Sequence, residues 1–454
     1  MKFEHIDRVY FVGIGGIGMS GLARYFNAIG KEVAGYDKTR TTLCETLELE
    51  GISISYDEQL EAVPTKFLEA SKTLVVYTPA VPTQHIQLSY FIANGFAVKK
   101  RAEVLGIITS ENTTLAVAGT HGKTTTSSIL AHLLKSAGEN INAFLGGIAL
   151  NYNSNVLLGD ASTVVVEADE FDRSFLHLKP NISVITNTDA DHLDIYGDGA
   201  SFIKGFEDFG SICREKGQLI CQKNVALPSD YSYGLDNTSD FYAHNIKVVD
   251  GAFRFSLQLL DKGAQNVVLA LPGRHNIENA VAASAIAFLH GLEIAQIVKG
   301  LESFKGVYRR FQYHLNTTEK VYIDDYAHHP SEIKATISSV KELFPHRHIT
   351  VIFQPHLFSR TRDFMGDFAE SLSLADEVIV LPIYPARERP IAGVNSEALA
   401  ALVQKAHCSV VHGSGLVESL KAKQLDVCLT LGAGDIDRLV APIYQTIKNQ
   451  GYDA

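Results

Sequence analysis

A glycine-rich segment at residues 119–125, Gly-Thr-His-Gly-Lys-Thr-Thr, has the residue types and spacing of a loop that holds nucleotide phosphates. The apolar run Leu115–Ala118 precedes it, and a helix-like stretch at 126–135 follows it. The first N–H groups of a helix attract anions, and the lysine and threonine of such a loop bind phosphate and Mg²⁺. A helix start without a ligand is the weaker interpretation, because strand, glycines, lysine, threonine and helix arrive in order. We therefore predict ATP binding by Gly119, Thr120, His121, Gly122, Lys123, Thr124 and Thr125, although Val117 stands where the common pattern has its first glycine.

Acidic residues follow two apolar runs downstream of this loop. Glu167 ends the run that begins at Thr163, and Asp189 and His192 follow the run 182–185. The carboxyl ends of parallel strands meet at one edge of a sheet, and Mg²⁺ prefers oxygen ligands. Without the upstream loop, these residues would be solvated turn acids. With it, the sequence predicts Mg²⁺ beside ATP, for which Glu167 and Asp189 are better suited than the histidine.

A second glycine pattern lies near the start of the chain, at residues 13–18, Gly-Ile-Gly-Gly-Ile-Gly. It follows a strand-like run and precedes a helix-like segment, Met19–Ile29. This arrangement places a pyrophosphate on a helix N-terminus, with an acid such as Asp37 near a ribose. The pattern alone suits a nicotinamide-dependent oxidoreductase, but a nucleotide sugar carries an equivalent pyrophosphate. The residues leave these two ligands open, and the predicted contacts are Gly13, Gly15, Gly16, Ile17, Gly18 and Asp37.

Polar clusters gather at predicted strand and helix ends in the last 180 residues. Histidine, arginine and aspartate at strand ends are typical of a ligand site, because that edge of an α/β sheet is open. Residues 273–276 fit either a purine contact or a helix cap with core packing, and residues 308–311 offer an arginine to phosphate. The other clusters are at 324–330, 354–362 and 432–436, and the last of these fits a tight turn equally well.

Short apolar runs alternate with amphipathic segments along the whole chain, as in parallel sheets covered by helices. The pattern restarts near residues 9, 114 and 320, which predicts three α/β domains with boundaries near 107 and 312. The polar segment Asp230–Asp240 is expected to be a loop or an edge insertion.

Composition excludes several classes of protein. The formal net charge of −11 argues against a general nucleic-acid binder, which needs a basic face. The five cysteines are scattered without Cys-x-x-Cys spacing, so neither disulfides nor a zinc site is expected. No apolar run is long enough to span a membrane, and the N-terminal run is too glycine-rich for a signal peptide. We expect a cytoplasmic enzyme with no nucleic-acid partner and no membrane insertion.

Taken in order, the motifs resemble the Mur ligase family, which builds the peptide stem of peptidoglycan. The similar segments are the glycine pattern, GTHGKTTT, EADE, DADH, GRHN, RRF, DDYAHHP, FQPHLFSRTRD and GAGD, and they span nearly the whole chain. The resemblance implies a Rossmann-like UDP-sugar-binding domain at 1–107, a P-loop ATPase-like central domain at 108–312, and a Rossmann-like C-terminal domain at 313–454. Within the family, the motifs are most similar to those of enzymes that join L-alanine to the lactyl carboxylate of UDP-N-acetylmuramate.

The resemblance also implies roles for individual residues. ATP would be bound together with two Mg²⁺ ions, and the carboxylate would be activated as an acyl phosphate. Thr124, Glu167 and His192 would hold metal; Lys123, His328, His356 and Arg360 would serve catalysis, with Tyr326 beside them; His275, Asn276 and Asn279 would contact adenine; Arg310 and Asp325 would contact phosphate and ribose.

Two alternatives remain, one ligase and one protein without catalytic activity. A related ligase that attaches a recycled murein tripeptide to the same sugar shares the front half of the pattern. A non-catalytic nucleotide-sugar sensor is disfavoured because the phosphate loop and the metal-binding residues are all present. The chain is expected to be a monomer or a homodimer.

Three positions depart from the family pattern. Leu357 stands where an arginine is common, so one cation is absent or supplied elsewhere. Other members carry a carbamylated lysine, but the comparable register here falls near Glu207, with Lys204 close by, so this modification is not expected. Asp189 stands where a glutamate is common, and a shorter acid there alters the support of the metal site.

Overall fold

The computed structural model describes residues 3–160, 162–189, 196–249, 251–386, 388–404 and 406–450. Across these residues the strands form three sheets, of five, ten and six strands. The chain divides into two compact units. The first comprises Met1–His244, Ser256–Val267 and Glu278–Phe304, and the second comprises Asn245–Phe255, Val268–Ile277 and Lys305–Ala454. The three sheets, each with its own helices, confirm the predicted α/β class with three domains. The domain boundaries near residues 107 and 312 stay predictions.

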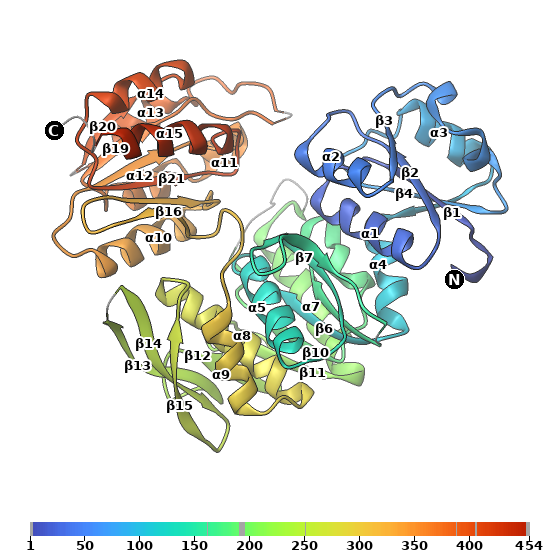
Figure 1. Cartoon of the computed structure of the whole chain (residues 1–454), viewed down its shortest axis with the longest axis horizontal. Helices are drawn as coiled ribbons and strands as arrows, with labels where there is room; N and C mark the ends of the chain where they lie inside the picture. Colours follow the sequence, from blue (N-terminus) through green and yellow to red (C-terminus); the bar gives the residue numbers. More distant parts are fainter. Residues whose placement is uncertain are drawn as a thin grey trace. The chain divides into compact units, whose positions relative to one another are not determined.

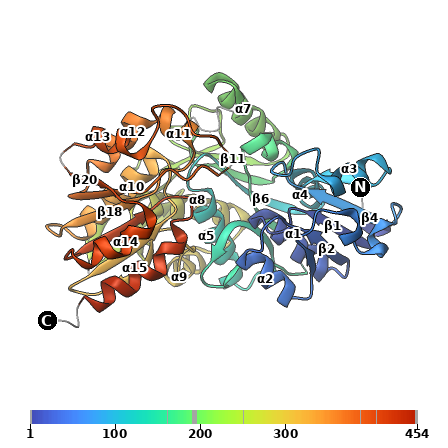
Figure 2. The same ribbon diagram turned by 90° about the horizontal axis from the view of Figure 1, so that it is seen from above.

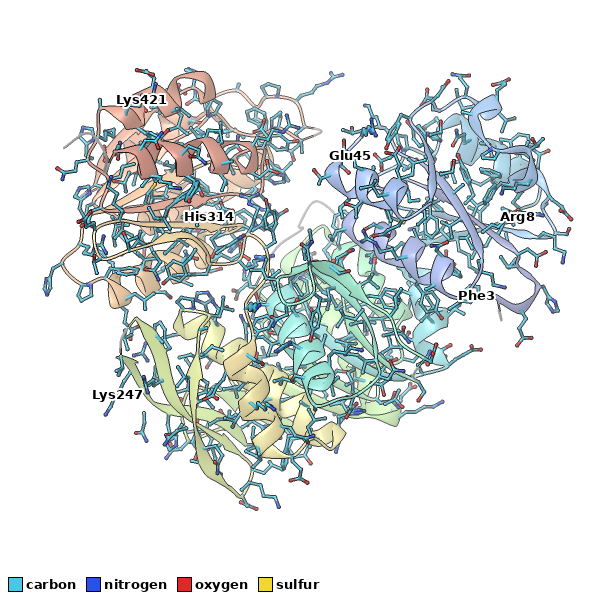
Figure 3. All side chains as sticks on the ribbon, viewed as in Figure 1. Phe3, Arg8, Glu45, Lys247, His314 and Lys421 are labelled. Atoms are coloured by element: carbon cyan, nitrogen blue, oxygen red, sulfur yellow. The ribbon has the colours of Figure 1, made fainter. Side chains whose placement is uncertain are left out.

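The first sheet belongs to the amino-terminal part of the first unit and is parallel throughout, in the order β3-β2-β1-β4-β5. Strand β1 is central and almost wholly buried, because its residues are apolar on both faces. Phe3 lies edge-on to Phe26, with ring centroids 5.0 Å apart (Figure 3). The elements are β1 Arg8–Val12, α1 Ile17–Ala28, β2 Glu32–Tyr36, α2 Thr42–Leu49, β3 Ser53–Ser55, β4 Thr73–Tyr77, α3 Ile86–Ala93, β5 Ala97–Lys100 and α4 Arg101–Ser110, with 3₁₀ turns η1 Phe3–His5, η2 Leu60–Ala62 and η3 Thr65–Leu68.

The second sheet carries the phosphate loop and has the order β15-β14-β13-β12-β11-β10-β6-β9-β7-β8. Strand β6 lies between β10 and β9, parallel to both, so the loops after these three strands emerge at one edge. Its elements are β6 Thr113–Ala118, α5 Lys123–Ser136, β7 Asn142–Ala149, β8 Ser154–Leu157, β9 Thr163–Glu167, η4 Phe171–His177, β10 Ile182–Ile185, α7 Gly199–Lys216, β11 Gln218–Gln222, β12 Tyr231–Gly234, β13 Phe241–Val249, β14 Ala252–Leu259, β15 Lys262–Leu269, α8 Arg274–His290 and α9 Ile294–Ser303 (Figure 1).

One expectation for this sheet was wrong. Part of the polar segment Asp230–Asp240 is strand β12, which pairs in parallel with both β11 and β13. Tyr233 is almost fully buried there. Backbone pairing and one buried aromatic ring outweigh the turn-forming residues around them.

The third sheet, in the second unit, has the order β16-β17-β21-β18-β19-β20, with β16 antiparallel to β17. Helices α12 and α13 cover one face, and α14 and α15 cover the other (Figure 2). The elements are β16 Gln312–Asn316, β17 Val321–Asp325, α10 Pro330–Leu343, β18 Ile349–Phe353, α11 Phe358–Asp363, α12 Met365–Leu372, β19 Glu377–Val380, α13 Ser396–Leu402, β20 His407–Val410, α14 Gly413–Lys421, β21 Val427–Leu431 and α15 Asp437–Asn449.

A single apolar core connects the first sheet with the second. Leu22 on α1, Val104 on α4, Phe144 on β7 and Phe206 on α7 all belong to it. At the margin of this core, the Asn155 amide donates to the carbonyl of Ile17 at 2.6 Å. The helix that follows the first glycine pattern is therefore anchored on the central sheet. Within the described ranges, no helix is both long enough and apolar enough to cross a bilayer.

Candidate active site

The phosphate loop follows β6 and leads directly into α5, whose N-cap is Gly122. Gly119 has φ +128° and Gly122 has φ +79°. Residues other than glycine rarely adopt these positive φ angles. A Cβ on Gly119 would also lie 2.0 Å from the Thr186 hydroxyl oxygen, and one on Gly122 would lie 2.5 Å from the Asn279 amide oxygen. Both glycines are therefore required by the protein's own packing, in addition to the phosphate approach that the sequence predicts.

Asn187, which follows strand β10, holds the loop in shape. Its side-chain oxygen accepts hydrogen bonds from the N–H groups of Thr120 and His121, each at 3.1 Å. The Thr186 hydroxyl donates to the His121 carbonyl at 2.5 Å. On the same side, the Thr120 hydroxyl donates to the Asp189 carbonyl at 2.7 Å. The residues that follow β10 thus fix the backbone that would receive phosphate.

Lys123 lies across the loop with its ammonium group already coordinated. Its Nζ donates to the carbonyls of Gly119 and Thr120, at 2.6 and 3.1 Å, and to Glu170 Oε2 at 2.6 Å. The Lys123 side chain is 12% exposed, and that of Glu170 is 1% exposed. Three acceptors therefore preset the position of the cation that phosphate would meet.

The charge state of this pair follows from its burial. Burial raises the pKa of Glu170 to about 7, although the Lys123 cation acts in the opposite direction. Burial acts to lower the pKa of Lys123, but the carboxylates of Glu170, Asp169 and Glu167 outweigh it and leave that pKa raised. Lys123 consequently keeps its positive charge at neutral pH.

Oxygen ligands suited to Mg²⁺ converge beside this lysine. The Thr124 hydroxyl donates to Glu167 Oε1 at 3.1 Å, and the Gly146 N–H donates to Glu167 Oε2 at 3.0 Å. A Cβ on Gly146 would lie 2.3 Å from that carboxylate, so the glycine keeps the space around it open. A hydroxyl and a carboxylate side by side fit a hard cation. Among the described residues, no group of three or more His, Cys, Asp or Glu side chains is arranged so that it could hold a metal ion. His192 lies outside the described residues.

The first glycine pattern joins β1 to α1, whose N-cap is Gly16. Gly13 has φ +90°, as a tight turn requires. Asp37 lies at the end of β2, and its Oδ2 accepts from the Gly15 N–H at 2.7 Å. The acid expected to contact a ribose therefore also closes this loop.

Helix α8 begins with the residues predicted to contact adenine. The Asn276 amide donates to the Pro272 carbonyl at 2.6 Å, and the Asn279 oxygen accepts from the Thr126 hydroxyl at 3.2 Å. Both asparagines are buried. These hydrogen bonds agree with the cap-and-core interpretation of this segment and leave its adenine contacts untested.

His275, on the same helix, is expected to make stability fall on acidification. Burial lowers the pKa of its imidazole from 6.5 to about 4, with Glu332 opposing this shift and Arg310 adding to it. The unfolded chain therefore takes up a proton below about pH 6.5 that the folded chain does not accept until about pH 4, so stability falls across this window. We expect His275→Gln to lose less Tm than the parent protein between pH 7 and pH 5, by ~2–4 °C, in differential scanning calorimetry. Equal losses in the two proteins would contradict this assignment.

In the second unit, two neighbouring arginines precede β16 and differ in their surroundings. Arg309 is buried and forms an ion pair with the buried Asp324, with Nε 2.8 Å from Oδ2, and it donates to the Gly432 carbonyl at 2.8 Å. Arg310 lies over the ring of Tyr326, with Cζ 5.0 Å from the centroid. Arg309 therefore ties the linker, residues 304–311 between α9 and β16, to the third sheet. Arg310 is the arginine that the sequence predicts to contact phosphate.

Asp325 ends β17 and organises the backbone around it. Its Oδ2 accepts from the Phe311 N–H at 3.1 Å and from the Thr336 hydroxyl at 3.2 Å, and its Oδ1 accepts from the Ala327 N–H at 2.9 Å. Burial raises the pKa of Asp325 to about 6, while Arg310 acts to lower it. This carboxylate thus joins β17, α10 and the residues before β16.

His328 follows β17 and His356 follows β18, two strands with β21 between them in the third sheet. The two rings approach each other, with centroids 6.2 Å apart. His328 Nδ1 lies 3.0 Å from the Tyr326 carbonyl and 3.3 Å from Glu332. His356 stacks on Tyr384, with centroids 5.7 Å apart. Two imidazoles predicted for catalysis are therefore brought to one place.

Arg360 and Leu357 lie at the start of α11. Arg360 is 8% exposed. Leu357 is its N-cap, with φ +69°, an unfavourable region for a branched side chain. Nearby, a cavity of about 340 Å³ is lined by the carboxyl end of β19 and the start of α15, including Gln354, Tyr384 and Asp435. This sheet edge therefore offers space for a small ligand.

Lys204 on α7 is 65% exposed and lies 2.9 Å from Asp208 and 3.5 Å from Glu207. The Lys204 ammonium donates a hydrogen bond to Asp208, which raises the pKa of the lysine. Carbamylation requires a neutral amine, so this environment disfavours the modification of Lys204.

Comparison with known proteins identifies the family. Three models match in chain order: the Mur ligase catalytic domain at 8–113, the Mur ligase middle domain at 117–287 and the Mur ligase glutamate ligase domain at 309–434. The UDP-N-acetylmuramate–L-alanine ligase of Flavobacterium psychrophilum is 48% identical over 450 residues, covering 99% of this chain and 100% of that protein. The chain belongs to the Mur ligase family. The enzyme of the same name from Parabacteroides distasonis is 49% identical, covering 99% of both chains.

Solved structures agree with this family membership. The UDP-N-acetylmuramate–alanine ligase of Thermotoga maritima is 29% identical with a TM-score of 0.82, covering 97% of this chain and 99% of that one. A murein peptide ligase from Psychrobacter arcticus is 22% identical with a TM-score of 0.70, over 97% of this chain and 99% of that chain, and shares the fold.

Several residues at the Mur ligase site carried no role in the sequence analysis. Glu170 holds Lys123, Asn187 holds the phosphate loop, and Arg309 with Asp324 holds the linker. A signal existed for Asn187, because it directly follows an apolar strand beside the loop. Glu170 and Arg309 lie within the EADE and RRF motifs, but the local sequence does not show that each forms a buried ion pair with a residue far along the chain or on another strand.

Proposed function

We propose that this chain joins L-alanine to the lactyl carboxylate of UDP-N-acetylmuramate, with ATP converted to ADP and phosphate. Identity of 48–49% over nearly the full length to proteins named for that reaction carries the proposal. The preset Lys123 and the adjacent Thr124 and Glu167 support it, because they suit the ATP chemistry that the reaction needs.

The reaction proceeds in two steps. A lactyl carboxylate oxygen attacks the γ-phosphorus of ATP, the bond to the β-phosphate oxygen breaks, and ADP leaves. The amine of L-alanine then attacks the acyl carbon through a tetrahedral intermediate, loses a proton, and expels phosphate. Lys123 balances charge on the transferring phosphoryl group, and its contacts with Gly119 and Glu170 keep it in position. Mg²⁺ bound by Thr124 and Glu167 would supply further charge neutralisation.

The remaining predicted residues receive roles in this scheme. His328, His356 and Arg360 serve the amino acid and the acyl phosphate, which carry a carboxylate and a phosphoryl group. His275, Asn276 and Asn279 contact adenine, and Arg310 and Asp325 contact phosphate and ribose. Glu167 and His192 hold a second metal ion, and the glycine pattern at 13–18 with Asp37 binds the UDP-sugar. We further propose a cytoplasmic location, because the nucleotide substrates are made there, and a monomer or homodimer.

A coupled assay of ADP release tests this function. Purified protein is supplied with Mg·ATP, UDP-N-acetylmuramate and one amino acid at a time. We expect turnover with L-alanine, and weaker turnover with glycine and L-serine, which differ from it by one small group. Omission of the UDP-sugar is the control and should leave only background ATPase. Turnover with the tripeptide L-alanyl-γ-D-glutamyl-meso-diaminopimelate, and none with L-alanine, would overturn the proposal.

A further inference from the structure

Three consecutive cations, Lys99, Lys100 and Arg101, lie at the start of helix α4. A helix N-terminus carries partial positive charge, so cations there are unfavourable unless other groups compensate them. Glu103 compensates in part, since its carboxylate accepts from the Lys100 N–H at 2.7 Å and lies 3.8 Å from Lys99 Nζ. The charges of the other two side chains are met by a different segment of the first unit.

That segment is the acidic loop, residues 167–172, which follows strand β9. Lys100 Nζ lies 2.8 Å from Asp172, and Arg101 Nη2 donates to Asp169 Oδ2 at 3.1 Å. The loop also contains Glu167, which faces Thr124, and Glu170, which holds Lys123. The start of α4 is therefore tied directly to the segment that shapes the ATP site.

Arg101 also reaches the first glycine pattern. A Cβ on Gly18 would lie 3.0 Å from Arg101 Nη1 and 3.1 Å from its Cδ, so the guanidinium passes directly over this glycine. Gly18 does not have a positive φ, so its backbone conformation does not require a glycine. The close approach of Arg101 leaves little space for a larger side chain at this position. Arg101 thus lies between the loop predicted for the UDP-sugar and the acidic loop.

Within the described residues, most of the hydrogen-bonding capacity of this arginine is unused. Its side chain is 21% exposed, and Asp169 is its one polar side-chain partner among the described residues. A guanidinium has five N–H donors, and its planar fork suits the oxygens of phosphate or carboxylate groups. A largely buried arginine with free donors beside an anion-binding loop is equipped to bind a ligand.

We propose that Arg101 binds an anionic group of the UDP-sugar and exchanges part of its interaction with Asp169 for that ligand. The inference rests on the proposed function, because it requires that the glycine pattern binds the UDP-sugar. Asp169 and the ligand compete for the Arg101 guanidinium. Binding of the ligand at the glycine pattern therefore weakens the ion pair that holds Asp169, and with it the acidic loop, to helix α4. Arg101 is both a binding residue for the UDP-sugar and a positioning residue for the ATP site.

Calorimetric binding of UDP-N-acetylmuramate to the full-length protein, without ATP, tests the inference. Arg101→Met removes the cation while keeping an unbranched chain, and should raise the Kd about tenfold or more. Asp169→Asn frees the guanidinium, and should lower the Kd about two- to fivefold, as expected for loss of a half-exposed competing ion pair. The asparagine oxygen can still accept from the Phe171 N–H, as the aspartate does at 3.1 Å. Lys100→Met is the matched control: it breaks the neighbouring ion pair to the same loop, and its Kd should stay within about twofold of the parent value.

The opposite directions of the two main effects separate ligand binding from a structural role. If Arg101 only held the acidic loop, then Arg101→Met and Asp169→Asn would change Kd in the same direction, or not at all, and the inference would be wrong. In steady-state turnover, Arg101→Met should raise KM for the UDP-sugar more than KM for ATP, and Arg101→Lys should recover part of the loss. A parent protein that does not bind UDP-N-acetylmuramate would overturn the proposed function and the inference together. Normal binding by the parent and by Arg101→Met would overturn the inference alone.

Discussion

Replacing Lys123 by methionine is expected to reduce turnover at least about a hundredfold, because a preset cation is lost from the transferring phosphoryl group. Binding of the UDP-sugar should change little, since its glycine pattern is a separate loop. ADP release and calorimetric binding of UDP-N-acetylmuramate measure the two effects. Lys135→Met provides the control, because Lys135 lies exposed on the same helix.

The same variant should also lose stability in a pH-dependent way. Without the lysine, Glu170 is a buried carboxylate with its cation removed, which costs roughly 3–5 kcal/mol while the group is ionised. Burial already raises its pKa to about 7, and loss of Lys123 removes an interaction that lowers it. The loss of stability is therefore largest at a pH above the pKa of Glu170 in the variant, where this carboxylate is ionised. It becomes smaller as the pH falls and Glu170 takes up a proton. We expect Lys123→Met to differ from the parent more at pH 8.5 than at pH 6 in thermal unfolding.

A double variant separates the two roles of this lysine. Glu170→Gln in the Lys123→Met background removes the buried charge, so it should restore most of the stability and none of the turnover. Recovery of turnover in the double variant would contradict the role of Lys123 on phosphate. A single variant as stable as the parent at pH 8.5 would contradict the buried ion pair.

Replacing Arg309 by methionine is expected to destabilise the second unit by about 3–5 kcal/mol, because it leaves Asp324 as a buried, unpaired carboxylate. The Thr430 hydroxyl still donates to Asp324 at 2.7 Å, but a neutral donor does not replace a guanidinium. Urea unfolding, followed by a probe in the second unit, measures the change.

The neighbouring arginine is the matched control for this prediction. Arg310→Met should destabilise the protein less than Arg309→Met does, because Arg310 packs on the Tyr326 ring and its charge acts on the buried Asp325 without a direct ion pair among the described residues, whereas Arg309 is ion-paired with Asp324. It should instead raise KM for ATP about tenfold, as expected when one charged contact to phosphate is lost. If the two variants lose equal stability, the distinction between the arginines is wrong.

The strands that carry the site were predictable because their signals are local. The runs before residues 119, 167 and 186 are mainly apolar, as is typical of strands buried on both faces, and they form β6, β9 and β10. The helix after the phosphate loop was predicted to start near Thr126, and it starts at Lys123 because Gly122 provides its N-cap. Strand β12 was not predicted, because turn-forming residues surround it and its pairing partners are distant in sequence.

The partners of the site residues were less predictable. Lys123 and Glu170 are 47 residues apart, and Thr120 and Asn187 are 67 apart, so no sequence period relates them. They meet because β9, β6 and β10 are parallel neighbours whose carboxyl ends share one edge. Even a correct strand assignment leaves the order of strands open, and it is this order that decides which loops face each other.

The sequence by itself determined the class of fold, the phosphate loop and the family, because each depends on residues close together along the chain. Only the tertiary structure decided what surrounds them. It assigned Glu170 to Lys123, separated the buried Arg309 from Arg310, and laid Arg101 over Gly18 beside the acidic loop. The physical reason is the same in each case. Burial and charge pairing depend on distances between elements, and the packing of sheets and helices fixes these distances after local structure has formed.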